Sequence, residues 1–148
     1  MQMQTRIVDH EITLVPYFPA PEQTLAWYQD PTLCLQVDGR PEPYDLPRLQ
    51  RMYEYLNERG MLYYICFQGQ LCGDICLQRS GEVNIVIAPA YQNRAIGRRV
   101  VHTLIGLAKE QGLAQLTATI YGFNRQSRRM FEAVGFCSVG PEEYRLTL

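Results

Sequence analysis

Three apolar runs of strand length follow one another between residues 61 and 89, and they limit the chain to a small set of folds. The runs are MLYYICF, LCGDICLQ and VNIVIAP, and the turns QGQ and RSGE between them are short and contain glycine. Short glycine-containing turns between apolar runs are typical of antiparallel hairpins. We therefore predict a three-stranded antiparallel meander in the middle of the chain.

The segments on either side of the meander show further helical and strand patterns. Before it, we predict a strand over 11–18, a short helix over 21–30, a proline-rich loop over 38–47 and a helix over 46–60 that stops at Gly60. After it, we predict a helix over 94–111, a strand over 116–121, a helix over 124–134 and strands over 136–140 and 142–148. The crossover helix makes a local parallel strand pair between residues 83 and 121. These patterns predict an α+β fold in which a mixed, mostly antiparallel sheet carries helices on both faces.

The composition is that of one globular domain. The chain has 148 residues, of which 47% are hydrophobic and 20% are charged, so we expect a single domain over 1–148 with a substantial core. No apolar run is long enough to cross a bilayer and the first residues show no signal-peptide pattern, so we expect a cytoplasmic protein. The five cysteines form no C-x-x-C pair, and we expect reduced thiols and no metal site.

The charges are unevenly divided along the chain, although the net charge is only −1. Residues 1–80 carry ten acidic and six basic side chains, whereas residues 81–148 carry five acidic and eight basic ones. The division is compatible with an ordinary solvated surface. It is equally compatible with a second half that holds an anionic ligand and a first half that faces a cationic one.

The stretch YQNRAIGRRVV, residues 91–101, lies between the last strand of the meander and the helix that follows it. Backbone N–H groups at a helix start have no partner within the helix, and the helix dipole is positive there. Such a turn is suited to phosphate groups. Arg94, Arg98 and Arg99 add positive charge beside it. The turn is therefore a candidate pyrophosphate site.

The order of elements, together with Gln92-Asn93-Arg94-Ala95-Ile96-Gly97 at the helix start, resembles the GNAT superfamily of N-acetyltransferases. The signature of that superfamily is Gln or Arg, two variable residues, Gly, one variable residue and then Gly or Ala, and only Ala95 departs from it. Asn124 stands seven residues before Phe131 and eleven before Gly135-Phe136, which is similar to a second block of the superfamily. The resemblance covers nearly the whole chain.

The resemblance implies acetyl-CoA as the cofactor, with its pyrophosphate on the turn and its pantetheine arm along the backbone of the preceding strand. Asn124 would contact the arm from the other side. The predicted cofactor-binding residues are Ile85, Val86, Ile87, Gln92, Asn93, Arg94, Ala95, Ile96, Gly97, Arg98, Asn124 and Phe131. If Ala95 lies in the right-handed helical region, the alanine is tolerated and even preferred over glycine, and we expect cofactor binding to survive because the turn is a helix start. A positive φ at this position would make the alanine costly.

Acetyl transfer to an amine needs a neutral amine, a path for its proton and an acid for the departing thiolate. Many members of the superfamily place a tyrosine acid where this chain has Phe131, which donates no proton. Tyr121 is the first candidate to replace that acid, and Tyr91 and Tyr144 are further candidates.

Two carboxylates are candidate bases. Glu82 stands close to a position where some members of the superfamily carry a catalytic glutamate. Asp74 lies inside an apolar strand, where a carboxylate is costly unless it is paired or functional, and a hydrogen bond to a nearby turn or helix is the alternative explanation. We therefore predict Asp74, Glu82 and Tyr121 as catalytic residues. The acceptor is expected against residues 16–60, whose aromatic and acidic side chains suit an ammonium group.

These observations favour an acetyl-CoA-dependent N-acetyltransferase that transfers an acetyl group directly to a primary amine of a small molecule or peptide. One alternative is a GNAT-fold module that binds acyl-CoA without efficient turnover, which Phe131 suggests. A nucleic-acid surface built from the arginines is another, but a net acidic chain without a helix-turn-helix or a stacking platform argues against it. We thus expect an amine acceptor as partner, no nucleic acid and no membrane, and a homodimer is one possible assembly.

Overall fold

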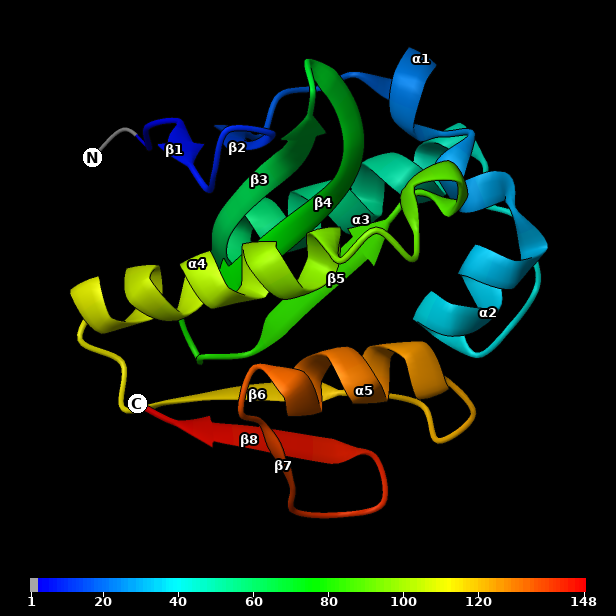
Figure 1. Ribbon diagram of the computed structural model, residues 1–148. Coiled ribbons are helices and arrows are strands. Elements are labelled where there is room, and N and C mark those ends of the chain that lie inside the picture. Colours follow the sequence, from blue (N-terminus) through cyan, green and yellow to red (C-terminus); the bar gives the residue numbers. More distant parts are fainter. Residues whose placement is uncertain (1–2) are drawn as a thin grey trace.

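The computed structural model describes residues 3–148, which form two antiparallel sheets (Figure 1). The larger sheet has the order β1-β2-β3-β4-β5, with β1 (Arg6–Ile7), β2 (Ile12–Pro16), β3 (Gly60–Phe67), β4 (Gln70–Gln78) and β5 (Val83–Ile87). The smaller sheet has the order β6-β8-β7, with β6 (Gln115–Thr119), β7 (Cys137–Ser138) and β8 (Glu143–Thr147). The predicted meander is confirmed as β3, β4 and β5.

The helices are α1 (Pro21–Thr24), α2 (Pro31–Asp38), α3 (Leu46–Arg59), α4 (Ile96–Glu110) and α5 (Arg125–Ala133), with short 3-10 turns η1 (Trp27–Gln29) and η2 (Pro89–Tyr91). The last three helices lie within two residues of their predicted bounds. The helix predicted over 21–30 is two short pieces, α1 and η1. The sequence patterns did not predict α2, which begins where the Asp30 side chain accepts the Leu33 N–H at 2.9 Å and Pro31 fills the first turn.

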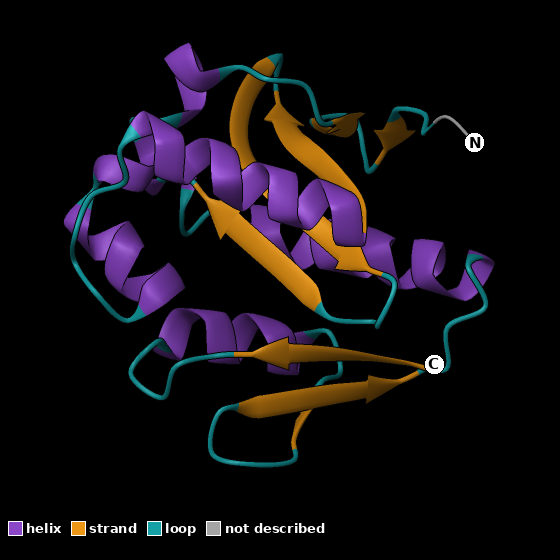
Figure 2. Ribbon diagram, turned by 180° about the vertical axis from the view of Figure 1, so that it is seen from behind, coloured by secondary structure: helices purple, strands orange, loops and turns teal. Residues whose placement is uncertain are grey.

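The two sheets meet at the start of β5 and β6, and these strands then diverge (Figure 2). Among the described residues, one parallel bridge joins them, between Glu82 and Thr117, and the Thr117 N–H donates to the Gly81 carbonyl at 3.0 Å. The predicted parallel pair is therefore confirmed in its direction, but it is a single bridge because the strands splay apart beyond it. The splay leaves one edge of β5 open.

Helices cover both faces of the larger sheet and bury two apolar clusters (Figure 2). Leu104 of α4 is fully buried in the first cluster, and Leu49 of α3 is buried in the second. Because side chains alternate along a strand, β3 contributes Ile65 to the α4 side and Tyr64 to the α3 side. The predicted arrangement of helices on both faces is confirmed.

No helix within residues 3–148 is both long and apolar enough to cross a membrane. Over the same residues, no three His, Cys, Asp or Glu side chains come together as a metal site. The cysteines are free thiols, and Cys34, Cys72 and Cys76 are buried.

Candidate cofactor and acceptor site

A cavity of about 770 Å³ opens where β5 and β6 diverge, and its size is that of a small-molecule site. Its wall includes the edge of β5, the end of β6, the turn before α4, the first turn of α4, one side of α5 and residues of α2 and α3. The wall includes these predicted residues: Asp74, Ile85, Val86, Ile87, Gln92, Asn93, Ala95, Ile96, Gly97, Arg98, Asn124 and Phe131. Among the predicted residues, Glu82, Arg94 and Tyr121 lie outside it.

The open edge of β5 presents backbone groups at alternate residues. The Glu82 carbonyl and the Ala88 N–H both bond to β4, at 2.9 and 2.7 Å. Val86 is an even number of residues from both, so its backbone N–H and C=O also face β4. The N–H and C=O groups of Ile85 and Ile87 point the other way, toward the open edge, where an extended ligand can pair with them as an added strand does.

Gln92 ties the turn before α4 to the end of β5 and to α2. Its Nε2 donates to the Ile87 carbonyl at 2.9 Å and to Gln36 Oε1 at 3.3 Å. The Ile87 carbonyl is thereby occupied, while the Ile85 groups and the Ile87 N–H remain for a ligand. Gln36 had no predicted role because α2 was not predicted.

The turn before α4 contains two non-glycine residues in the left-handed conformation, Asn93 with φ 65° and Ala95 with φ 59° and ψ 19°. Ala95 therefore has the positive φ that makes an alanine costly, and does not lie in the right-handed helical region where an alanine would be preferred. A left-handed alanine costs about 1–2 kcal/mol because its Cβ approaches the following carbonyl. Ala95 is also the residue that precedes α4, and no side chain caps this helix among the described residues. The first N–H groups of α4 are therefore available to a ligand.

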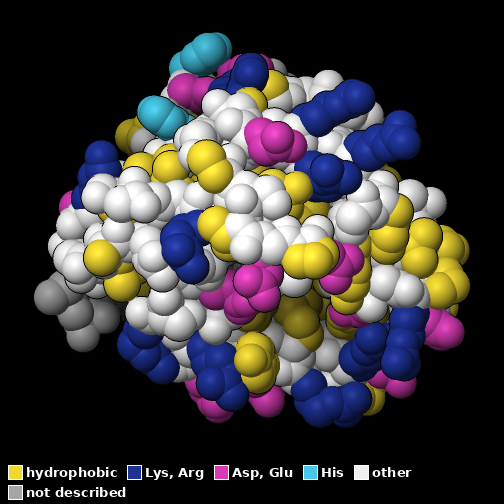
Figure 3. Space-filling view, turned by 90° about the horizontal axis from the view of Figure 1, so that it is seen from below, with side chains coloured by type: hydrophobic (Ala, Val, Ile, Leu, Met, Phe, Trp, Pro, Cys, Tyr) yellow, Lys and Arg dark blue, Asp and Glu magenta, His cyan; other side chains and the backbone are white. Residues whose placement is uncertain are grey.

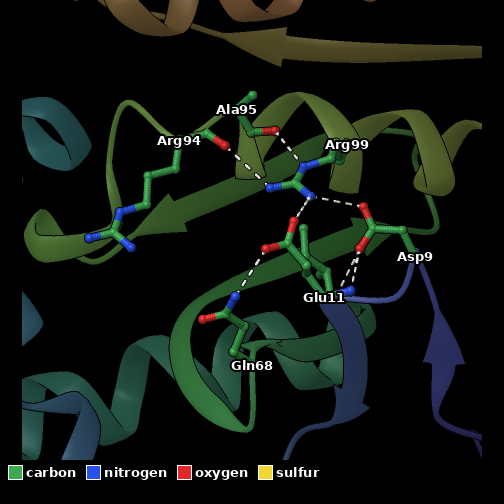
Figure 4. Close-up of polar contacts among 7 residues, drawn as sticks. Asp9, Glu11, Gln68, Arg94, Ala95 and Arg99 are labelled. Carbon is green, nitrogen blue, oxygen red and sulfur yellow. Dashed lines mark hydrogen bonds and ion pairs between the residues drawn. The ribbon is translucent and has the colours of Figure 1, made fainter.

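The three arginines near the start of α4 occupy different positions. Arg98 lines the cavity. Arg94 lies outside the wall, with its guanidinium 5.5 Å from the centre of the Tyr91 ring. Arg99 also lies outside the wall and pairs with two acidic residues of the β1–β2 turn (Figure 4). Of the three predicted cations, Arg98 is thus the one that adds its charge to the cavity wall.

Asp74 is a buried carboxylate on the sheet face that α3 covers. Its side chain is 2% exposed, and its Oδ2 accepts the hydroxyl of Tyr28 at 2.6 Å and that of Tyr53 at 3.0 Å. Burial raises the pKa of Asp74 to about 6, against the lowering effect of the two tyrosine hydrogen bonds. The predicted burial is confirmed. A carboxylate with this pKa is mostly ionised at neutral pH and can accept a proton.

A sequence model described as the acetyltransferase (GNAT) family matches residues 22–136 of the chain. The chain belongs to the GNAT acetyltransferase family. The match includes β5, the turn and α4, and it ends at Phe136 after α5. No curated protein sequence matches the chain.

Solved acetyltransferases share the fold of this GNAT chain at low sequence identity. The microcin C7 self-immunity acetyltransferase MccE, solved with acetyl-CoA and AMP, is 14% identical with a TM-score of 0.77, over 95% of this chain and 94% of that one. A GNAT acetyltransferase from Bacillus anthracis is 16% identical with a TM-score of 0.79, over 93% and 95%. The ribosomal L7/L12 N-terminal acetyltransferase RimL, solved with coenzyme A, is 11% identical with a TM-score of 0.73, over 98% of both chains.

The α5 side of the GNAT cavity has an amide and an aromatic ring. Asn124 Oδ1 accepts the Ser127 N–H at 3.2 Å and so caps α5, while the residue lines the cavity. Phe131 is buried and packs edge-on against Phe136 with ring centres 5.0 Å apart. It therefore contributes surface to the wall but no hydroxyl.

The other two predicted catalytic residues have partners away from the cavity. Tyr121 stacks on Phe123 with ring centres 5.5 Å apart, and its ring lies against Gly39. Glu82 accepts a hydrogen bond from Gln78 Nε2 at 2.7 Å. The catalytic roles of Tyr121 and Glu82 stay predictions.

Of the two remaining candidate tyrosines, one reaches the cavity. Tyr91 lines it and packs on Phe67 with ring centres 6.1 Å apart. Tyr144 is buried, and its hydroxyl accepts from Arg128 Nε at 3.0 Å. Of these two tyrosines, Tyr91 is therefore the one that lines the cavity.

The region expected to bind the acceptor contributes aromatic and acidic side chains to the cavity. From residues 16–60 the wall includes Tyr28, Leu33, Gln36, Val37, Asp38, Tyr44, Met52, Tyr55 and Leu56. Asp30 and Asp45, two acidic residues of the same region, cap α2 and α3, because their side chains accept the Leu33 and Arg48 N–H groups. The signal for the missed helix was Asp30-Pro31 followed by apolar residues at helical spacing.

Proposed function

We propose that this GNAT protein is an acetyl-CoA-dependent N-acetyltransferase that moves an acetyl group directly to a primary amine of a small molecule or peptide. The observation that carries the proposal is one cavity whose wall includes both a helix start with an open strand edge and the buried carboxylate of Asp74. The first two features suit a coenzyme, and the third suits an amine. MccE and RimL, which share the fold, are solved with acetyl-CoA or coenzyme A.

The chain fits the coenzyme at three places. The first N–H groups of α4, with Arg98 beside them, would hold the pyrophosphate. The open-edge groups of Ile85 and Ile87 would pair with the amides of the pantetheine arm. Asn124 would contact the arm from the α5 side. Val86 would contribute its side chain, since its backbone pairs with β4.

Asp74 is the proposed proton acceptor. The amine nitrogen bonds to the acetyl carbon, the carbon–sulfur bond breaks, and the proton that the nitrogen loses goes to Asp74, directly or through a water. The hydroxyls of Tyr28 and Tyr53 hold the carboxylate in place. Because Phe131 has no proton to give, the departing sulfur takes its proton from solvent or from Tyr91.

A thiol-release assay with acetyl-CoA tests this function. The acceptors are polyamines, aminoglycosides, amino acids and peptides with free N-termini, and the variants are Asp74→Asn, Glu82→Gln and Tyr121→Phe. We expect Asp74→Asn to lose about a hundredfold in kcat/KM, the usual effect of removing a general base. The other two variants decide whether Glu82 and Tyr121 contribute. Unchanged rates in all three would overturn the catalytic assignments.

The second candidate function is a module that binds acyl-CoA without efficient turnover. The observation in its favour is Phe131, which leaves the α5 side of the cavity without an acid. Calorimetry, which measures acetyl-CoA binding, separates the two functions when it is combined with the thiol-release assay. Acetyl-CoA binding without acetylation of any acceptor in the panel would favour the module.

We further propose a cytoplasmic location and no nucleic-acid partner. Figure 3 shows basic side chains spread among acidic and apolar ones on the face it presents. Two of the arginines that could form a basic surface already donate hydrogen bonds within the chain, Arg99 to Asp9 and Arg128 to the Tyr144 hydroxyl. DNA or RNA binding that weakens steeply with salt would contradict this proposal. The homodimer stays a prediction, which light scattering of the full chain tests.

A further inference from the structure

Arg99 joins the turn before α4 to a distant part of the chain (Figure 4). Its Nη1 donates to Asp9 Oδ2 and to Glu11 Oε1, at 2.9 Å each. Its Nε donates to the Ala95 carbonyl and its Nη2 to the Arg94 carbonyl, both at 3.3 Å. All three guanidinium nitrogens therefore donate hydrogen bonds, and this one side chain connects the β1–β2 turn to the turn before α4.

The two acidic partners of Arg99 are themselves held in place. Asp9 Oδ1 accepts the N–H groups of Glu11 at 2.8 Å and of Ile12 at 2.9 Å. Glu11 Oε2 accepts from Gln68 Nε2 at 3.0 Å, and the Gln68 N–H donates to the Glu11 carbonyl at 2.8 Å. Asp9 and Glu11 are thus anchored by the backbone of their own turn and by the β3–β4 turn.

The two carbonyls that Arg99 contacts belong to the peptide units on either side of Ala95. The Arg94 carbonyl lies in the unit before Ala95, whose orientation sets φ, and the Ala95 carbonyl lies in the unit after it, whose orientation sets ψ. Fixing both units therefore fixes the left-handed conformation of Ala95. Alanine adopts this conformation at a cost and has no polar side chain to offset it.

We propose that Arg99 is a positioning residue which, with Asp9 and Glu11, holds Ala95 left-handed and thereby keeps the first N–H groups of α4 directed into the cavity. The proposal rests on the proposed function, because those groups would bind the coenzyme. The arrangement depends on the fork of the guanidinium more than on its charge, since four acceptors in different directions are satisfied at once. A lysine has the charge but not this geometry.

The test combines Arg99→Gln, Arg99→Lys, Ala95→Gly and the double variant Arg99→Gln/Ala95→Gly in the full chain. The readouts are the acetyl-CoA dissociation constant from calorimetry and the melting temperature of the ligand-free protein. The matched controls are Arg6→Gln and the double variant Arg6→Gln/Ala95→Gly. Arg6 pairs with Glu110 at 2.9 and 3.0 Å and joins β1 to the other end of α4.

We expect Arg99→Gln to bind acetyl-CoA about tenfold more weakly, and Arg99→Lys to behave like it rather than like the wild type. Ala95→Gly in the Arg99→Gln background should restore affinity to within about threefold, because glycine takes the left-handed conformation without Arg99. Arg6→Gln should lower the melting temperature by about 3 °C with no change in affinity. Full affinity in either Arg99 variant, or no rescue by glycine, would overturn the proposal.

The melting temperatures keep this proposal separate from the proposed function. If the wild type binds no acetyl-CoA, the function fails but the positioning role is still tested. In that case Ala95→Gly should raise the melting temperature more in the Arg6→Gln background, where Arg99 still holds Ala95 left-handed at a cost, than in the Arg99→Gln background, where Ala95 can leave that conformation. Equal effects of the glycine in both backgrounds would show that Arg99 contributes only general stability and would overturn the positioning role.

Discussion

Replacing Asp74 by asparagine should change how the stability of the protein depends on pH. Burial raises the pKa of Asp74 from 3.8 to about 6, so the folded protein binds this proton more tightly than the unfolded chain does. The stabilising effect of the bound proton is complete below pH 3.8 and is lost as the pH rises through 6. One pKa unit corresponds to about 1.4 kcal/mol, so the loss is about 3 kcal/mol. Asparagine keeps an oxygen for both tyrosines but does not titrate.

Urea denaturation of the ligand-free protein at pH 4.0 and pH 7.5 measures this effect. The difference in the free energy of unfolding, Asp74→Asn minus wild type, should increase by about 2 kcal/mol between the two pH values, in favour of the variant, because at pH 4.0 the unfolded chain already has part of its Asp74 ionised. Glu132→Gln serves as the control, because it removes a carboxylate from the exposed surface of α5.

The result that would refute the reasoning is a difference that does not change with pH. Asp74 would then not carry the burial cost on which its role as base depends. A wild type that gains stability over the variant as the pH rises would indicate a cationic partner for Asp74. That outcome would also remove the reason to expect a carboxylate that accepts a proton near neutral pH.

Tyr53→Phe removes one of the two hydrogen bonds that lower the pKa of Asp74, so the acid limb of the pH profile of kcat/KM should move to higher pH. Tyr63→Phe, on the other sheet face, should leave the limb in place, and equal profiles for the two variants would contradict the link between Tyr53 and the pKa of Asp74. Leu104→Ala opens a hole in the cluster under α4 and should lower the free energy of unfolding in urea by about 2–5 kcal/mol, and a loss below about 1 kcal/mol would show that the site is not packed. Gly73→Ala places a Cβ against the Val86 carbonyl and should disrupt the β4–β5 ladder, which circular dichroism and size exclusion detect; a folded variant with the wild-type melting temperature would show that the ladder adjusts.

Features that depend on local pattern were predictable from the sequence. The β3–β5 meander follows from apolar runs separated by glycine turns, and α4 and α5 follow from helical spacing of apolar residues. Asp74 was recognised as a buried acid because it lies inside an apolar strand, where a carboxylate is costly unless it is paired or functional. Its partners could not be read from the sequence. The signature around Gln92 located the turn before α4 because it is contiguous in the chain.

The missed features depend on contacts between distant segments. Helix α2 is short, and its capping residue Asp30 was assigned to the end of the helix predicted over 21–30, so Gln36 and Asp38 of the cavity wall had no predicted role. Tyr121 was expected at the cofactor cleft, but packing on Phe123 places it outside the wall. Whether a side chain at a strand end faces a cavity is decided by its neighbours and not by its spacing.

The sequence by itself determined the order of the elements from α3 to α5, the position of the turn and the presence of a buried carboxylate, because each follows from the chemistry of adjacent residues. Only the tertiary structure decided the conformation of Ala95 and the role of Arg99. An alanine favours the right-handed region when it is considered alone. In the structure Ala95 is left-handed instead, and Arg99 beside it pairs with Asp9 and Glu11, which lie about 90 residues away in the chain.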